Sequence, residues 1–252
     1  MRSAQSNEPL LPSAVARVAA VLAAFGPRDT ALGTSELARR TGLPKSTVHR
    51  LTQELVRHRL LEHSGTALRL GLRLFELGGL VTQQRDLRDV ALPYMSDLQE
   101  ATRQTVHLAV LEGTDVVYIQ ILRSKDAPRM PSRIGGRVPA HATGVGKAML
   151  AFSPPETVDA VIAAGLDPVG PRTITAPGLL RRQLSRIRTT GVAFDQEESG
   201  PGVVCAASPL LGPDGLPRAA VSVSGWGGRL NVNRIATAVR TTSLALAREL
   251  SP

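Results

Sequence analysis

The stretch that most constrains this chain covers residues 34–61, TSELARRTGLPKSTVHRLTQELVRHRLL. It predicts two short helices joined by a tight turn. Thr34 or Ser35 can cap the first helix, because a side-chain oxygen there accepts from the free N–H groups of the first turn. Gly42 suits the left-handed residue that ends a helix, and Pro44 suits the first position of the next one. The stretch therefore predicts a helix-turn-helix.

The second helix of this pair is amphipathic. Val48, Leu51 and Leu55 recur at helical spacing, so one face is expected to pack inward. The other positions carry hydrogen-bond donors that can reach phosphates and base edges in a major groove. The residues expected to read DNA from this helix are Lys45, Ser46, Thr47, His49 and Arg50.

Basic residues and a hairpin favour DNA over an ordinary charged surface. Between Leu37 and Arg50 the chain has four basic residues and no acid. The following segment RLLEHSGTALRLG predicts a strand, a Ser64-Gly65 turn and a second strand, which makes a winged helix-turn-helix. Phosphate contacts are expected from Arg39, Arg40 and Arg69. The alternatives are a solvated helical pair and a winged helix that docks onto protein.

The charge of the chain is unevenly distributed over its 252 residues, a length that suits two domains. Residues 1–84 hold 11 Lys and Arg against 6 Asp and Glu, and residues 85–252 hold 19 against 15. This asymmetry fits a basic DNA-binding module followed by a nearly neutral domain. With one cysteine and no apolar run of membrane-spanning length, the sequence predicts a cytoplasmic protein without disulfides or membrane contact.

The hydrophobic pattern divides the chain into four parts. Residues 1–12 are expected to be a disordered tail, and residues 13–71 a winged helix-turn-helix. It opens with a helix that Ser13 caps and that carries Val15, Val18, Leu22 and Phe25 on one side. Residues 72–84 predict a connector helix whose apolar stripe pairs with another subunit. Residues 85–252 then predict an α+β domain: a helix over 87–102 bent or restarted at Pro93, a hairpin, further helices, three strand-like runs and a final helix.

Five segments identify a resemblance across residues 13–250. They are GLPKSTVHRLTQELVRHRLLE, LRLFELGG, RIGGRVPAHATGVGKAML, GVAFDQEESGPGVVCAASPLL and AAVSVSG. In this order the chain resembles the isocitrate-lyase-regulator (IclR) family of bacterial transcription factors. The resemblance implies a winged helix, a connector helix and a C-terminal effector domain similar to GAF domains. It also implies a homodimer or a dimer of dimers that controls a catabolic operon.

The resemblance also implies an effector pocket. Its positions in this sequence are Gly144 and Val145, through their backbone amides, and the side chains of Asp195, Cys205, Ser222 and Ser224. Strand alternation supports the last pair, since Ser222 and Ser224 point to one face and their valine neighbours to the other. Amides, hydroxyls and a thiol suit a small carboxylate or oxo-acid.

Two other chemistries compete for these residues. Cys205 with His141 and Asp195 would form a cysteine hydrolase triad, but no helix start or nucleophile elbow surrounds Cys205, and a buried pocket residue is the favoured reading. His107, His141, Asp195 and Glu197 lack the spacing of a metal site, although the resemblance leaves zinc open. We therefore predict a DNA-binding regulator that is not an enzyme, has no cofactor or metal, and is controlled by a small organic acid.

Overall fold

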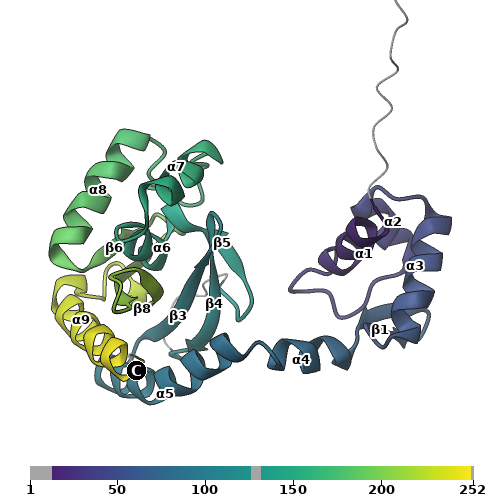
Figure 1. Cartoon of the computed structure of the whole chain (residues 1–252), viewed down its shortest axis with the longest axis horizontal. Helices are drawn as coiled ribbons and strands as arrows, with labels where there is room; N and C mark the ends of the chain where they lie inside the picture. The colour runs from purple at the N-terminus through teal and green to yellow at the C-terminus, as the bar shows by residue number, and fades with distance from the viewer. Residues whose placement is uncertain (1–12, 126–131, 251–252) are drawn as a thin grey trace, which may run out of the picture. The chain divides into compact units, whose positions relative to one another are not determined.

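The computed structural model describes residues 13–125 and 132–250 (Figure 1). The predicted disordered tail, residues 1–12, lies outside these ranges. The chain divides into two compact units that meet between Thr82 and Gln83.

The first unit is a three-helix domain with a two-stranded wing, followed by a fourth helix. Its elements are α1 (Ala14–Ala23), α2 (Thr34–Thr41), α3 (Lys45–Arg57), β1 (Leu61–Ser64), β2 (Ala67–Leu70) and α4 (Leu72–Gly79). The strands β1 and β2 are antiparallel, and Leu32 adds an isolated bridge to Leu68. One core holds the unit together, made of Val21, Leu32, Leu37, Val48, Leu55, Leu61 and Leu68. The predicted winged helix-turn-helix is confirmed.

Some helix boundaries differ from the sequence expectation. Ser13 caps α1 as predicted, with its hydroxyl accepting from the N–H of Ala16 at 3.1 Å. Neither Thr34 nor Ser35 caps α2, because the helix already begins at Thr34 and the cap position is Gly33, which has no side chain to contribute. Gly42 is left-handed at φ 68°, as the turn requires.

The inward face of α1 is as predicted for Val18, Leu22 and Phe25 but not for Val15. Val15 is 78% exposed, whereas Val21 is fully buried. Val18 and Leu22 are partly buried against the core. Val15 lies in the first turn of α1, and its apolar side chain faces solvent.

The second unit is a six-stranded antiparallel sheet with helices on both faces. Its elements are α5 (Thr82–Thr102), β3 (Thr105–Glu112), β4 (Asp115–Leu122), β5 (Arg137–Pro139), η1 (Ala140–Ala142), α6 (Gly144–Leu150), α7 (Pro155–Ala163), α8 (Pro177–Thr190), β6 (Ala193–Gln196), β7 (Val203–Leu211), β8 (Pro217–Trp226) and α9 (Val232–Glu249). The strand order is β5-β4-β3-β8-β7-β6. Helices α5 and α9 cover one face, and α6, α7 and α8 cover the other. The predicted α+β class is confirmed.

Helix α5 runs without a break through Pro93, so the predicted restart at that residue is wrong. Proline removes one backbone hydrogen bond. The helix nevertheless keeps a continuous buried stripe of Leu87, Ala91, Met95 and Leu98 against the sheet. This packing outweighs the lost hydrogen bond.

Candidate functional site

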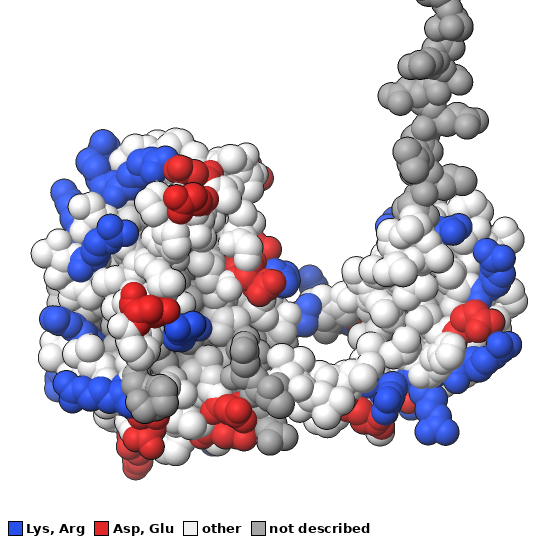
Figure 2. All heavy atoms as spheres, in the orientation of Figure 1, with Lys and Arg blue, Asp and Glu red and all other residues white. Residues whose placement is uncertain are grey.

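The exposed surface of α3 carries the polar residues predicted to meet DNA. Lys45, Ser46, His49 and Arg50 are exposed and Thr47 is half-buried. Val48 and Leu55 are buried on the opposite side, and Leu51 is partly buried. No ion pair within the described residues engages Lys45 or Arg50, so both cations are available to a partner. Figure 2 shows Lys and Arg side chains along the side of this unit where α3 lies.

The two arginines of α2 differ in their surroundings. Arg40 donates to Glu36 at 2.7 Å, to the carbonyl of Ala24 at 2.9 Å, and to the carboxylate of Asp29. Among the described residues Arg39 pairs with Glu36 alone, at 2.6 Å, and its side chain is 73% exposed. Hydrogen bonds from Arg39 and Arg40 lower the pKa of Glu36 to about 2. Arg40 thus ties α2 to the end of α1, while Arg39 stays accessible.

The wing arginine is held by an acid that also caps the next helix. Arg69 donates to Glu62 at 2.9 Å, and the other carboxylate oxygen of Glu62 accepts from the N–H of Leu72 at 3.0 Å. The Leu72 N–H and, second, Arg69 lower the pKa of Glu62. One carboxylate therefore joins the wing to the first turn of α4.

In the second unit, a cavity of about 280 Å³ lies between the sheet and the start of α6. All six predicted effector residues line it: Gly144, Val145, Asp195, Cys205, Ser222 and Ser224. Thr143 caps α6, its hydroxyl accepting from the N–H of Gly146 at 3.0 Å. A side chain at position 144 would overlap the sulfur of Cys205, so glycine is needed for this close approach.

The cavity is also lined by a buried histidine, His107, which the predicted pocket did not include. His107 is paired with Ser222 across β3 and β8, and its Nδ1 lies 3.5 Å from the hydroxyl of Ser224. Its Nε2 lies 3.0 Å from the hydroxyl of Ser132, and its ring stands 5.1 Å from that of Tyr118. Burial, assisted by Arg123, lowers the pKa of His107 to about 3, so the imidazole is neutral at physiological pH.

Asp195 and Cys205 are neighbours across β6 and β7. The carboxylate of Asp195 accepts from the backbone N–H of Glu198 at 2.7 Å and of Ser199 at 3.4 Å. Burial raises the pKa of Asp195, and it also raises the pKa of the Cys205 thiol. Burial thus favours the protonated forms of both groups, and Arg137 adds a guanidinium to the cavity lining.

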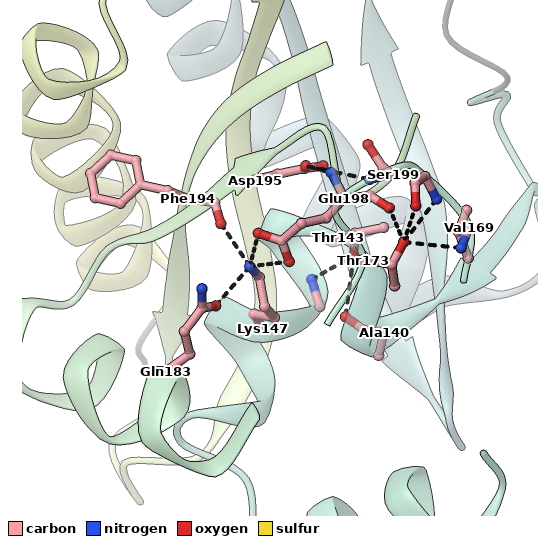
Figure 3. A network of polar contacts seen from close by, with 12 residues as sticks. Ala140, Thr143, Lys147, Val169, Thr173, Gln183, Phe194, Asp195, Glu198 and Ser199 are labelled. Atoms are coloured by element: carbon pink, nitrogen blue, oxygen red, sulfur yellow. Dashed lines mark hydrogen bonds and ion pairs between the residues drawn. The ribbon is translucent and has the colours of Figure 1, made fainter. Parts of the chain in front are cut away.

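A buried ion pair supports the segment after β6, whose backbone N–H groups donate to the carboxylate of Asp195 (Figure 3). The ammonium of Lys147, on α6, contacts the carboxylate of Glu198 and donates to the carbonyl of Phe194 and the side chain of Gln183, each at 2.8 Å. Lys147 is fully buried and Glu198 is 4% exposed. The same segment is fixed by Thr173, whose hydroxyl donates to the carbonyl of Glu198 at 2.6 Å. Lys147 therefore connects α6, α8 and the residues after β6.

The three residues of the alternative hydrolase triad, Cys205, His141 and Asp195, do not come together in one site. The Nε2 of His141 lies 3.0 Å from the carbonyl oxygen of Asp167, and His141 does not line the cavity that holds Cys205. A raised thiol pKa leaves Cys205 without the thiolate that nucleophilic catalysis needs. Within residues 13–125 and 132–250, no three His, Cys, Asp or Glu side chains are grouped as a metal site would require.

The neutral state of His107 predicts a pH effect on stability. An unfolded chain protonates this histidine below about pH 6.5 and the folded protein does not, so stability is lost as the pH falls through that value towards about 3. We expect His107→Gln to show a shallower loss of unfolding free energy between about pH 6.5 and about pH 4. Urea titrations across this pH range measure the free energy of unfolding. Parallel curves for the two proteins would contradict a buried neutral imidazole.

A winged helix-turn-helix joined to a sheet domain whose cavity is lined by hydroxyls, a thiol and a carboxyl group defines a DNA-binding regulator with a ligand-binding domain. Two family models match this chain: the IclR helix-turn-helix domain over residues 14–65, and the bacterial transcriptional regulator IclR C-terminal domain over residues 79–251. The chain belongs to the IclR family of bacterial transcriptional regulators. Its class is that of a regulator, not an enzyme.

Known relatives are similar to this chain over nearly its whole length. The HTH-type transcriptional regulator XynR of Escherichia coli is 32% identical over 248 residues, which cover 96% of this chain and 98% of XynR. The crystal structure of an IclR homologue from Microbacterium hydrocarbonoxydans, complexed with 4-hydroxybenzoate, has a TM-score of 0.87 at 33% identity, covering 94% of this chain and 99% of that one. The Thermotoga maritima IclR structure has a TM-score of 0.75 at 27% identity, covering 94% of this chain and 98% of that one.

No helix among the described residues combines the length and apolar character needed to cross a bilayer.

Proposed function

We propose that this protein controls a catabolic operon in response to a small organic acid, and that its winged helix reads a pseudo-palindromic operator. The observation that carries the proposal is the cavity of the second unit, which is lined by hydroxyls, a neutral imidazole and the first turn of a helix. On the DNA side, Lys45, Ser46, Thr47, His49 and Arg50 of α3 contact base edges and phosphates. Arg39 and Arg69 contact phosphates after exchanging their acidic partners, and Arg40 contributes mainly by holding α2 in place.

The cavity suits a carboxylic acid that also bears a hydroxyl group. The backbone N–H groups of Gly144 and Val145 lie in the first turn of α6 and lack partners within the helix, so they can donate to a carboxylate. Ser222, Ser224 and neutral His107 can each donate or accept, which suits a hydroxyl. The similarity to a relative crystallised with 4-hydroxybenzoate supports a hydroxylated acid as effector.

Ser222→Ala tests this assignment. We expect it to weaken binding of 4-hydroxybenzoate, or of whichever small acid the protein binds, by about fivefold, since one neutral hydrogen bond is worth about 1 kcal/mol. Isothermal titration calorimetry measures the affinity after a thermal-shift screen of small carboxylates. The matched control is Ser185→Ala, an exposed serine on α8 outside the cavity. If no carboxylate stabilises the protein and neutral analogues do, the organic-acid effector is excluded.

The apolar side chains of α4 support subunit pairing. None of its residues is buried within this chain, and Leu72, Phe75 and Leu80 are 64%, 79% and 72% exposed. Apolar side chains gathered on one short helix mark an interaction surface. We propose that α4 pairs with α4 of a second copy, giving a homodimer or a dimer of dimers.

Phe75→Glu is expected to shift the protein towards monomer, because it places a charge in that apolar surface. Sedimentation velocity gives the oligomeric state at matched concentrations. Val15→Glu is the control, since Val15 is equally exposed and lies on a different helix. An unchanged oligomer in Phe75→Glu would remove α4 from the interface.

A further inference from the structure

A second cavity in the ligand-binding unit shares no residue with the effector cavity. It has a volume of about 500 Å³ and lies where the end of α8, the end of β7 and the second half of α9 meet. Pro209, Leu211 and Leu244 contribute apolar surface. The space is large enough for a small organic molecule.

The polar lining of this cavity is basic. Arg188, Arg240 and Arg248 line it, and no Asp or Glu is among its described lining residues. The ion pairs of the described residues engage Arg181 with Asp159 on the outer side of α8, but none engages these three arginines. Arg188 donates its Nε to the carbonyl of Ala151 at 2.6 Å. Figure 2 shows blue side chains along the side of this unit where α8 and α9 lie.

Helix-end electrostatics does not explain all three arginines. Arg188 and Arg248 lie in the last turns of α8 and α9, where a cation is favoured by the helix dipole. Arg240 lies in the middle of α9 and still faces the cavity, with its Nε close to Gly191. An anion in the cavity would explain why a third arginine is directed there.

Two buried hydroxyls belong to the same cavity. Ser243 donates to Ser208 at 2.7 Å, and Ser208 donates to the carbonyl of Gly191 at 2.8 Å. Both serines are at most 2% exposed. They hold α9, β7 and the turn after α8 in one arrangement, so the cavity is preformed.

We propose that this cavity is a second small-molecule site, which binds an organic anion whose carboxylate or phosphate group meets Arg240 and Arg248 and whose apolar part contacts Pro209 and Leu244. The two cavities differ in their charged lining: the effector cavity has one arginine, Arg137, together with Asp195, whereas this one has three arginines and no acid among its described lining residues. Guanidinium groups bind carboxylates and phosphates through paired hydrogen bonds.

Calorimetry on the full chain tests the site with phenyl phosphate and benzoate as probes and benzyl alcohol as the neutral comparison. We expect at least one anionic probe to bind, and Arg240→Gln/Arg248→Gln to weaken it by about tenfold or more, since two charge-assisted contacts are lost. Leu244→Trp should also weaken it, because the larger side chain fills the cavity while every charge remains. Leu244 is 50% exposed, so this change is compatible with folding.

Two controls separate this site from its alternatives. Arg182→Gln/Arg186→Gln removes two exposed charges of α8 outside the cavity and should leave the affinity unchanged. Ser222→Ala should leave it unchanged as well, since Ser222 belongs to the effector cavity. Absence of binding by both anionic probes, equal losses in the two arginine pairs, or equal binding of benzyl alcohol would overturn the proposal. The effector cavity is tested separately, by Ser222→Ala with 4-hydroxybenzoate.

Discussion

Replacing Lys147 with methionine should lower the free energy of unfolding by about 3–5 kcal/mol, because it leaves the carboxylate of Glu198 buried without its partner. Lys147 is fully buried. Its ammonium contacts the side-chain oxygen of Gln183, the carbonyl oxygen of Phe194 and the carboxylate of Glu198. Methionine keeps the length of the side chain, so little packing is lost. Urea denaturation followed by circular dichroism measures the change.

The loss should shrink as the solution is acidified. Burial already raises the pKa of Glu198, and Lys147 opposes that shift, so removal of Lys147 raises the pKa further. A carboxyl group whose pKa is raised in the folded state favours folding when protonated, and this contribution is lost as the pH rises through the folded pKa. The stability of Lys147→Met should therefore approach that of the wild type as the pH falls through the raised pKa of Glu198.

Two further variants show whether the unpaired charge is the cause. Lys147→Met/Glu198→Gln removes both charges and should recover a large part of the loss. Arg181→Ala breaks the exposed pair with Asp159 and should cost no more than about 1 kcal/mol. If the double variant were as unstable as Lys147→Met at neutral pH, lost packing rather than an unpaired carboxylate would be the explanation.

Local patterns in the sequence predicted the parts of the fold that depend on neighbouring residues. The helix-turn-helix follows from the spacing of Val48 and Leu55, and from Gly42, whose left-handed conformation the structure shows. The alternation along β8 correctly separates Ser222 and Ser224 from Val221 and Val223, which pack under α5 and α9. These signals repeat within one turn or one strand, so tertiary packing does not alter them.

The partners of several charged and polar residues could not be predicted, because they come from distant positions. Arg40 was expected to contact phosphate, but its pairing with Asp29 depends on how α1 and α2 pack. Lys147 and Glu198 are 51 positions apart. His107 was considered only as a possible metal ligand, although it stands beside Ser222 in the sheet, and the strand order β3-β8 is what brings the two together.

Arg50→Ala should weaken operator binding by about 1–3 kcal/mol, equivalent to roughly 5- to 150-fold, if its guanidinium reads a base. Arg50 is exposed on α3, and no ion pair within the described residues has to be broken before it meets DNA. The matched control is Arg57→Ala in the last turn of the same helix, where the arginine is paired with Glu54 at 3.4 Å. Residues near the start of a recognition helix contact bases, whereas its end leaves the groove, so Arg57→Ala should have the smaller effect.

Gel-shift titrations of the upstream promoter fragment at several salt concentrations distinguish a base contact from a phosphate contact. A base contact relaxes specificity for one base pair, whereas a phosphate contact lowers the slope of log affinity against log salt by about one. An unchanged affinity and slope for Arg50→Ala would show that α3 meets DNA through other residues, and a salt slope near zero for the wild type would favour a protein partner instead.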